Sequence, residues 1–77
     1  MEIKPGQIWK HYKGNNYKII VVARHSETLE PLVVYERITD IGNTGSLGNV
    51  YARPLDMFFN HIEIDGYSGP RFEYIKE

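Results

Sequence analysis

The sequence contains no cysteine, which excludes a disulfide framework and any thiolate metal site. It also lacks an apolar run near the roughly 20 residues that span a bilayer, and residues 1–6 lack the charged-then-apolar pattern of a signal peptide. From these absences we expect a cytoplasmic protein that is not embedded in a membrane. An excess of charge of one sign is missing as well. The formal net charge is -1, so the overall field gives no electrostatic argument for binding to nucleic acid.

The length of the chain points to a single domain. A protein of 77 residues buries only about 60% of its unfolded surface, which leaves nothing for a second core. Hydrophobic residues make up 42% of the sequence and charged residues 25%, values typical of a globular domain and not of a disordered chain. We therefore expect one domain over residues 1–77.

Short β-favouring segments alternate with turn residues along the whole chain. We expect strands over residues 7–12, 17–23, 32–37, 50–53, 61–64 and 71–75, with the last two forming a closing hairpin. Residues 38–49 contain three glycines and predict a loop, and Pro54 opens a single helical turn. This pattern predicts an all-β fold, a small SH3-like antiparallel β-barrel of five or six strands with one short helical turn.

The strand at residues 17–23 is apolar on both of its predicted faces. Period-two alternation places Tyr17, Ile19, Val21 and Ala23 on one face and the remaining apolar residues on the other. We therefore expect this strand to be covered on both sides near its end.

The candidate site is a polar segment enclosed by two apolar strands. Arg24, His25, Ser26, Glu27 and Thr28 are consecutive and offer most of the side-chain chemistry used to hold a ligand. Imidazole titrates near neutral pH, and guanidinium presents a fixed set of donors to phosphate or carboxylate. A polar hairpin loop that satisfies its own backbone groups explains the same residues.

Further members of the site come from later in the chain. Arg53 and Arg71 each adjoin a proline, and beside Tyr35 they can stack on a ring or project to bind an anion. We include all three in the predicted ligand site. The three histidines show neither His-x-His nor His-Glu-x-x-His spacing, so we expect no metal and no other cofactor.

Several motifs resemble, in order, those of the DUF1653 family of small bacterial proteins of unknown function. The resemblance rests on segments 11–15, 23–30, 33–35, 53–58 and 70–72, of which Ala-Arg-His-Ser-Glu-Thr at 23–28 is the most specific. It implies an SH3-like β-barrel and no established function. The chain departs from the family pattern in the longer loop at 38–49 and at Tyr51, where we expect tryptophan.

We interpret the protein as a non-enzymatic binding module that captures a ligand with Arg24, His25, Glu27, Thr28 and Tyr35, assisted by Arg53 and Arg71. A small anionic or nucleotide-like molecule suits this chemistry, and a protein partner suits the fold.

Two other functions stay open. One is a nucleic-acid-binding barrel with stacking tyrosines and phosphate contacts from Lys10, Lys13 and Lys18. The other is a small hydrolase that uses His25 with Glu27 as general base and orienting group.

Overall fold

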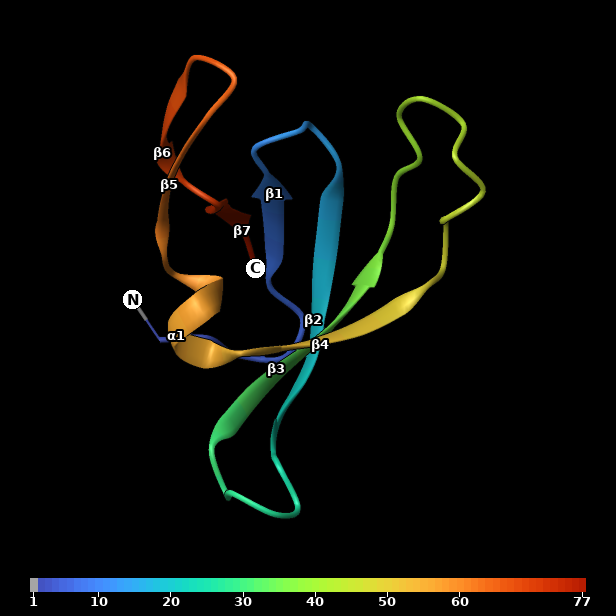
Figure 1. The fold of residues 1–77 in the computed structure, drawn as a ribbon. Helices are drawn as coiled ribbons and strands as arrows, with labels where there is room; N and C mark the ends of the chain where they lie inside the picture. Colours follow the sequence, from blue (N-terminus) through green and yellow to red (C-terminus); the bar gives the residue numbers. More distant parts are fainter. Residues whose placement is uncertain (1) are drawn as a thin grey trace.

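The computed structural model describes residues 2–77 and contains seven strands and one short helix (Figure 1). The elements are β1 (Ile8–His11), β2 (Asn16–Arg24), β3 (Pro31–Arg37), β4 (Val50–Pro54), α1 (Leu55–Phe58), β5 (His61–Ile64), β6 (Tyr67–Pro70) and β7 (Phe72–Lys76). The predicted all-β class and the helical turn after Pro54 are confirmed, whereas the strand number exceeds the expected five or six. No helix in residues 2–77 has the length and apolarity needed to cross a membrane.

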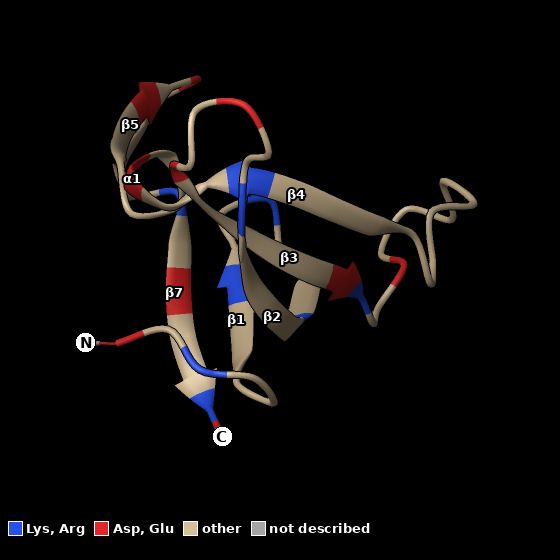
Figure 2. Ribbon diagram, turned by 90° about the horizontal axis from the view of Figure 1, so that it is seen from below, with Lys and Arg blue, Asp and Glu red and all other residues tan. Residues whose placement is uncertain are grey.

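Five strands form an antiparallel sheet in the order β4-β3-β2-β1-β7. Viewed from below, β1 to β4 follow one another across a twisted sheet and β7 lies beside β1 (Figure 2). Within residues 2–77 no ladder joins β4 to β7, so the sheet is open and the expected closure into a barrel is not observed.

The predicted closing hairpin is wrong. Strand β5 pairs with β6 through the two-residue turn Asp65-Gly66, and β7 pairs instead with β1. Both turn residues have positive φ, 50° and 82°, as the tight turn favoured by right-twisted hairpins requires. The sequence predicts a loop at residues 67–70 because Tyr-Ser-Gly-Pro shows no apolar alternation, yet the turn brings them directly against β5.

A β-bulge in β2 changes which side chains face the core. Ile19 lies opposite Tyr35, but the next paired residue is Val21, so Ile20 is an extra residue in the ladder. Beyond the bulge Val22 lies opposite the buried Val33, and Val21 turns to the outer face, where it is 44% exposed. Val21 and Ala23 therefore do not share a face with Tyr17 and Ile19, contrary to what strict alternation predicts. The end of β2 is not covered on both sides either, because Val21 is exposed on the outer face.

The core lies on the inner face of the sheet, where α1 packs against it. Phe58 is fully buried and stacks on Phe72 of β7, with 4.2 Å between ring centroids, while its edge meets Trp9 of β1 at 5.3 Å. The indole N–H of Trp9 donates to the side-chain oxygen of the buried Gln7 at 3.1 Å. Phe58 thus anchors the short helix to the sheet, and hollows remain on either side of it.

Candidate functional site

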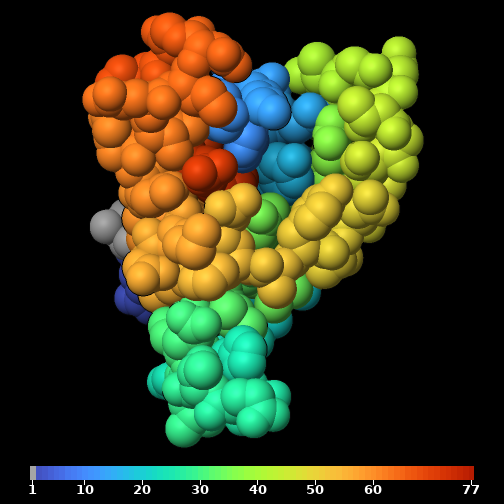
Figure 3. Space-filling view, in the orientation of Figure 1, coloured from blue at the N-terminus to red at the C-terminus, as the bar shows by residue number. Residues whose placement is uncertain are grey.

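One cleft of about 220 Å³ opens on the inner face of the five-stranded sheet. Its lining comes from all five strands: His11 in β1, Tyr17 in β2, Tyr35 in β3, Tyr51 and Arg53 in β4, and Phe72 in β7. The space-filling view shows this face hollowed between the β5–β6 hairpin and the region of β4 (Figure 3). We call the cleft lined by these six residues the inner cleft.

The strand register brings the inner cleft together. His11 lies opposite Phe72 across the β1–β7 ladder, and Tyr35 lies opposite Tyr51 across the β3–β4 ladder. Directly opposed residues in adjacent strands point to the same face, and side chains two positions apart along a strand share that face. The same rule places Arg53 on the inner face, because it opposes the buried Val33.

The inner cleft is electropositive. Burial, and after it the nearby positive charges of Arg71, Lys13, Arg53 and Arg37, together lower the pKa of His11 from 6.5 to about 4. The imidazole is therefore neutral at physiological pH. Its Nδ1 accepts a hydrogen bond from the backbone N–H of Lys13 at 3.2 Å, which leaves Nε2 to carry the proton.

The arginines around the inner cleft differ in how their charge is compensated. Arg37 is buried and pairs with Asp40 at 3.1 Å, and Arg71 donates to the side-chain oxygen of Asn60 at 3.0 Å. Arg53 is half-buried and donates to the Tyr35 hydroxyl at 3.4 Å, and no carboxylate among residues 2–77 forms a salt bridge with it. The Arg53 guanidinium is thus available to form an ion pair with an anionic group of a ligand in the cleft.

The hydroxyl of Tyr17 keeps its proton at neutral pH. Burial raises the pKa of Tyr17 above its ordinary value of 10.0, and this effect exceeds the opposing influence of the adjacent Arg37 charge. The Tyr17 ring meets those of Tyr35, Tyr51 and Phe72 edge to face, with centroid distances of 5.3 to 6.2 Å. These edge-to-face contacts hold the rings in place around the cleft.

In the polar segment predicted from the sequence, Arg24 ends β2 and residues 25–28 belong to the loop between β2 and β3. The segment uses much of its polar chemistry internally. Arg24 donates to the carbonyl of Leu29 at 3.0 Å. His25 Nδ1 accepts from the backbone N–H groups of Glu27 at 3.1 Å and Thr28 at 3.3 Å. Within the described chain no hydrogen bond or ion pair joins the Glu27 carboxylate to His25, so an acid–base pair of these two side chains is not assembled in this conformation.

The predicted site residues therefore fall into two groups. Tyr35 and Arg53 meet in the inner cleft, and the charge of Arg71 acts on His11 there. Arg24 lies opposite Pro31 and the loop residues lie beyond it, whereas Pro31 is four positions from Tyr35 along β3, or about 13 Å at ~3.3 Å per residue. The hypothesis that all seven side chains grip one small ligand does not fit this separation.

Sequence reasoning does not assign the other residues of the inner cleft to the ligand site. It considers Tyr17 only as part of a predicted strand face, Tyr51 and Phe72 only within the family resemblance, and His11 only among the three histidines that lack the spacing of a metal site. The available signal is the alternation of Tyr35 with Arg37 and of Tyr51 with Arg53, which puts an aromatic and a cation on the same strand face. In the part of the chain that the structure describes, no three His, Asp or Glu side chains gather as a metal site would require.

The comparisons with known proteins agree with the motif resemblance. The model of the family described as "Protein of unknown function (DUF1653)" matches residues 7–74. The chain belongs to the DUF1653 family. Its structure is similar to the crystal structure of a DUF1653 protein from Bordetella bronchiseptica, with a TM-score of 0.77 and 31% sequence identity over 97% of this chain and 90% of that chain. The search of curated proteins gave no match.

Proposed function

We propose that this DUF1653 protein is a binding module that holds the anionic group of a small molecule in the inner cleft. The observation that carries the proposal is Arg53, a half-buried guanidinium without a carboxylate partner among residues 2–77. It faces a cleft whose histidine is kept neutral by burial and by surrounding positive charge. An anion is the ligand that such a field favours.

The lining suggests how a ligand is held. The Arg53 guanidinium offers paired donors to a carboxylate or phosphate, and the hydroxyls of Tyr17 and Tyr51 add single donors. The volume of about 220 Å³ lies below the roughly 300–1,000 Å³ of pockets for drug-sized ligands, so the cleft takes a small anionic group and not a whole large ligand. The planar part of a molecule such as a nucleotide then lies outside the cleft, where the 37% exposed ring of Tyr51 can pack against it.

The test is calorimetric titration with adenosine monophosphate and, in parallel, inorganic phosphate. We expect the Arg53→Gln variant to bind at least about tenfold more weakly, because a hydrogen bond to a charged group contributes about 1.5–3 kcal/mol. Arg24→Gln is the matched control, since it removes the same charge at the end of β2, outside the inner cleft.

Each outcome assigns the site differently. If Arg24→Gln loses binding and Arg53→Gln keeps it, then Arg24, His25, Glu27 and Thr28 form the site and the cleft proposal fails. If the protein prefers oligonucleotides and its affinity for them falls steeply as the salt concentration rises, the nucleic-acid alternative is supported instead. Native mass spectrometry of protein purified from its own cells, with a denatured aliquot beside it, identifies a retained ligand by mass.

We further propose that the sheet is an open form of the SH3-like barrel. Support comes from the strand order, because the last strand, β7, returns beside the first and makes β4 and β7 the two edges. A barrel of five strands needs one more ladder between these edges. Solution measurement of amide protection in β4 and β7 tests whether such a ladder forms.

A further inference from the structure

Two further hollows lie beside α1, which contributes Leu55 to both. One hollow of about 390 Å³ is lined by Glu30, Pro31, Leu55, Asp56 and Phe59. A neighbouring hollow of about 310 Å³ shares Leu55 and Phe59 with it and adds Glu2, Ile3 and Val22. We call the two together the α1 groove.

The floor of the α1 groove is apolar because of two local features. Leu55 and Phe59 are four positions apart at the helical turn, so they project to the same side of α1. The bulge at Ile20 turns Val22 to the inner face, next to the same two side chains. Phe59 remains 44% exposed and Val22 38% exposed, although both line a concave surface.

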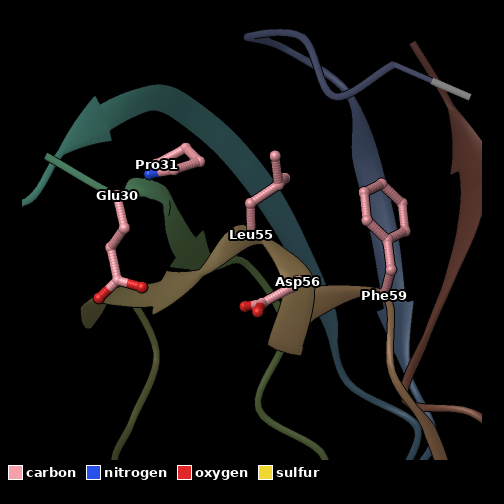
Figure 4. A pocket seen from close by; sticks show the side chains of 5 residues that line it. All are labelled: Glu30, Pro31, Leu55, Asp56 and Phe59. Carbon is pink, nitrogen blue, oxygen red and sulfur yellow. The ribbon is translucent and has the colours of Figure 1, made fainter.

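The rim of the α1 groove is acidic. Glu2, Glu30 and Asp56 are exposed, and neither hollow is lined by lysine or arginine. Figure 4 shows Pro31, Leu55 and Phe59 along one side of the first hollow and the carboxylates of Glu30 and Asp56 along the other. Among residues 2–77 these three carboxylates form no salt bridge, and the nearby Arg24 is directed to the carbonyl of Leu29. No ion pair among the described residues therefore neutralises these carboxylates.

We propose that the α1 groove binds an extended peptide segment of a partner protein, in which apolar side chains are flanked by lysine or arginine. An extended segment presents alternate side chains to one surface at about 7 Å spacing, which suits two adjoining apolar hollows. Basic residues beside them meet the acidic rim, so charge complementarity selects the partner and apolar contact supplies the affinity. This site is separate from the inner cleft in residues and in charge.

The experiment is selection of random heptapeptides displayed on phage against three forms of the full chain. These are the wild type, the double variant Glu30→Lys/Asp56→Lys, and the matched control Glu63→Lys/Glu73→Lys. The control changes net charge equally at exposed positions outside the groove. Far-ultraviolet circular dichroism verifies that each form is folded.

We expect the wild type and the control to enrich peptides that combine apolar residues with adjacent lysine or arginine. The variant Glu30→Lys/Asp56→Lys should bind synthetic copies of those peptides at least tenfold more weakly. In its own selection it should enrich peptides that carry acidic residues where the first set carries lysine or arginine. Unchanged affinity in the groove variant, or no basic-apolar class from the wild type, overturns the proposal.

Two further measurements distinguish peptide binding in the α1 groove from binding in the inner cleft and from dimer formation. An enriched peptide titrated into isotope-labelled protein should shift the amide signals of Leu55, Asp56 and Phe59, and Arg53→Gln should leave its affinity unchanged. A loss of peptide binding in Arg53→Gln would instead place the peptide in the inner cleft and overturn the proposal. Sedimentation that shows a dimer abolished by Glu30→Lys/Asp56→Lys would assign the groove to a second copy of the chain and overturn the partner proposal.

Discussion

Acidification is expected to destabilise this protein mainly through one histidine in the inner cleft. The unfolded chain takes up a proton on His11 near pH 6.5, whereas the native state resists it until about pH 4, because burial and the neighbouring positive charges disfavour imidazolium. The unfolded state thus binds more protons between these values, and stability falls as the pH falls. The contribution is fully present above about pH 6.5 and fully lost below about pH 4.

The size of this effect follows from the pKa difference. The gap between 6.5 and about 4 corresponds to about 3 kcal/mol at 1.36 kcal/mol per pKa unit. The ring is partly exposed, and solvent screening reduces the figure to about 1–2 kcal/mol. Roughly half of it, about 0.5–1 kcal/mol, should be lost between pH 7.5 and pH 5.0, before the bulk of the carboxylates titrate.

Urea unfolding followed by Trp9 fluorescence at these two pH values measures the loss. In His11→Asn, the amide oxygen can replace Nδ1 as acceptor for the Lys13 N–H, and the variant should lose about 0.5–1 kcal/mol less stability over the pH change. His61→Asn, at an exposed position, is the control and should keep the wild-type sensitivity. An equal loss of stability in the wild type and in His11→Asn would refute this account of the cleft.

Three further substitutions test the packing. Phe58→Ala removes the fully buried ring between α1 and the sheet and should lower the free energy of unfolding by about 3–5 kcal/mol, measured by urea denaturation. Asn15→Ala removes the buried oxygen that accepts from Ile41 N–H and the Thr39 hydroxyl at 2.8 Å each; we expect a loss of about 2–3 kcal/mol and faster hydrogen exchange at Ile41. Gly66→Ala forces a Cβ into a turn position with φ of 82° and should cost about 1–2 kcal/mol, seen as weaker amide protection in β5 and β6.

Local sequence patterns are sufficient to predict several elements of the fold. Strands β1 and β2 follow from two β-favouring runs, and the helical turn follows from Pro54. These features depend on neighbours in sequence, which is why they are predictable. The bulge at Ile20 is not, because the residues on both sides of it are apolar and alternation alone gives no sign of an extra residue.

The candidate site is less predictable because its residues are far apart in the sequence and become neighbours only through strand pairing. His11 and Phe72 lie at opposite ends of the sequence and become neighbours only when β7 pairs with β1. The sequence instead draws attention to the contiguous polar segment from Arg24 to Thr28 and predicts that its side chains share a site with Arg53. Contiguity in sequence favours the hypothesis of a single site, but a hairpin loop and the centre of a sheet are separated in space.

The β5–β6 hairpin has a consequence for motion at the mouth of the inner cleft. It forms its own two-stranded sheet and leans on the main sheet through the stacked rings of Tyr67 and Tyr12, whose centroids are 5.4 Å apart. Its two joints, Asn60 and Arg71, are tied to each other by a backbone and a side-chain hydrogen bond. We expect the hairpin to rotate as one rigid arm about these two joints and to displace the Tyr67 ring relative to Tyr12, whereas the hydrogen bond from the Tyr12 backbone N–H to the Arg71 carbonyl at 2.9 Å holds Arg71 beside the end of β1. Relaxation dispersion should report one exchange rate shared by residues 61–70 and Tyr12, on the microsecond-to-millisecond timescale of such collective motions.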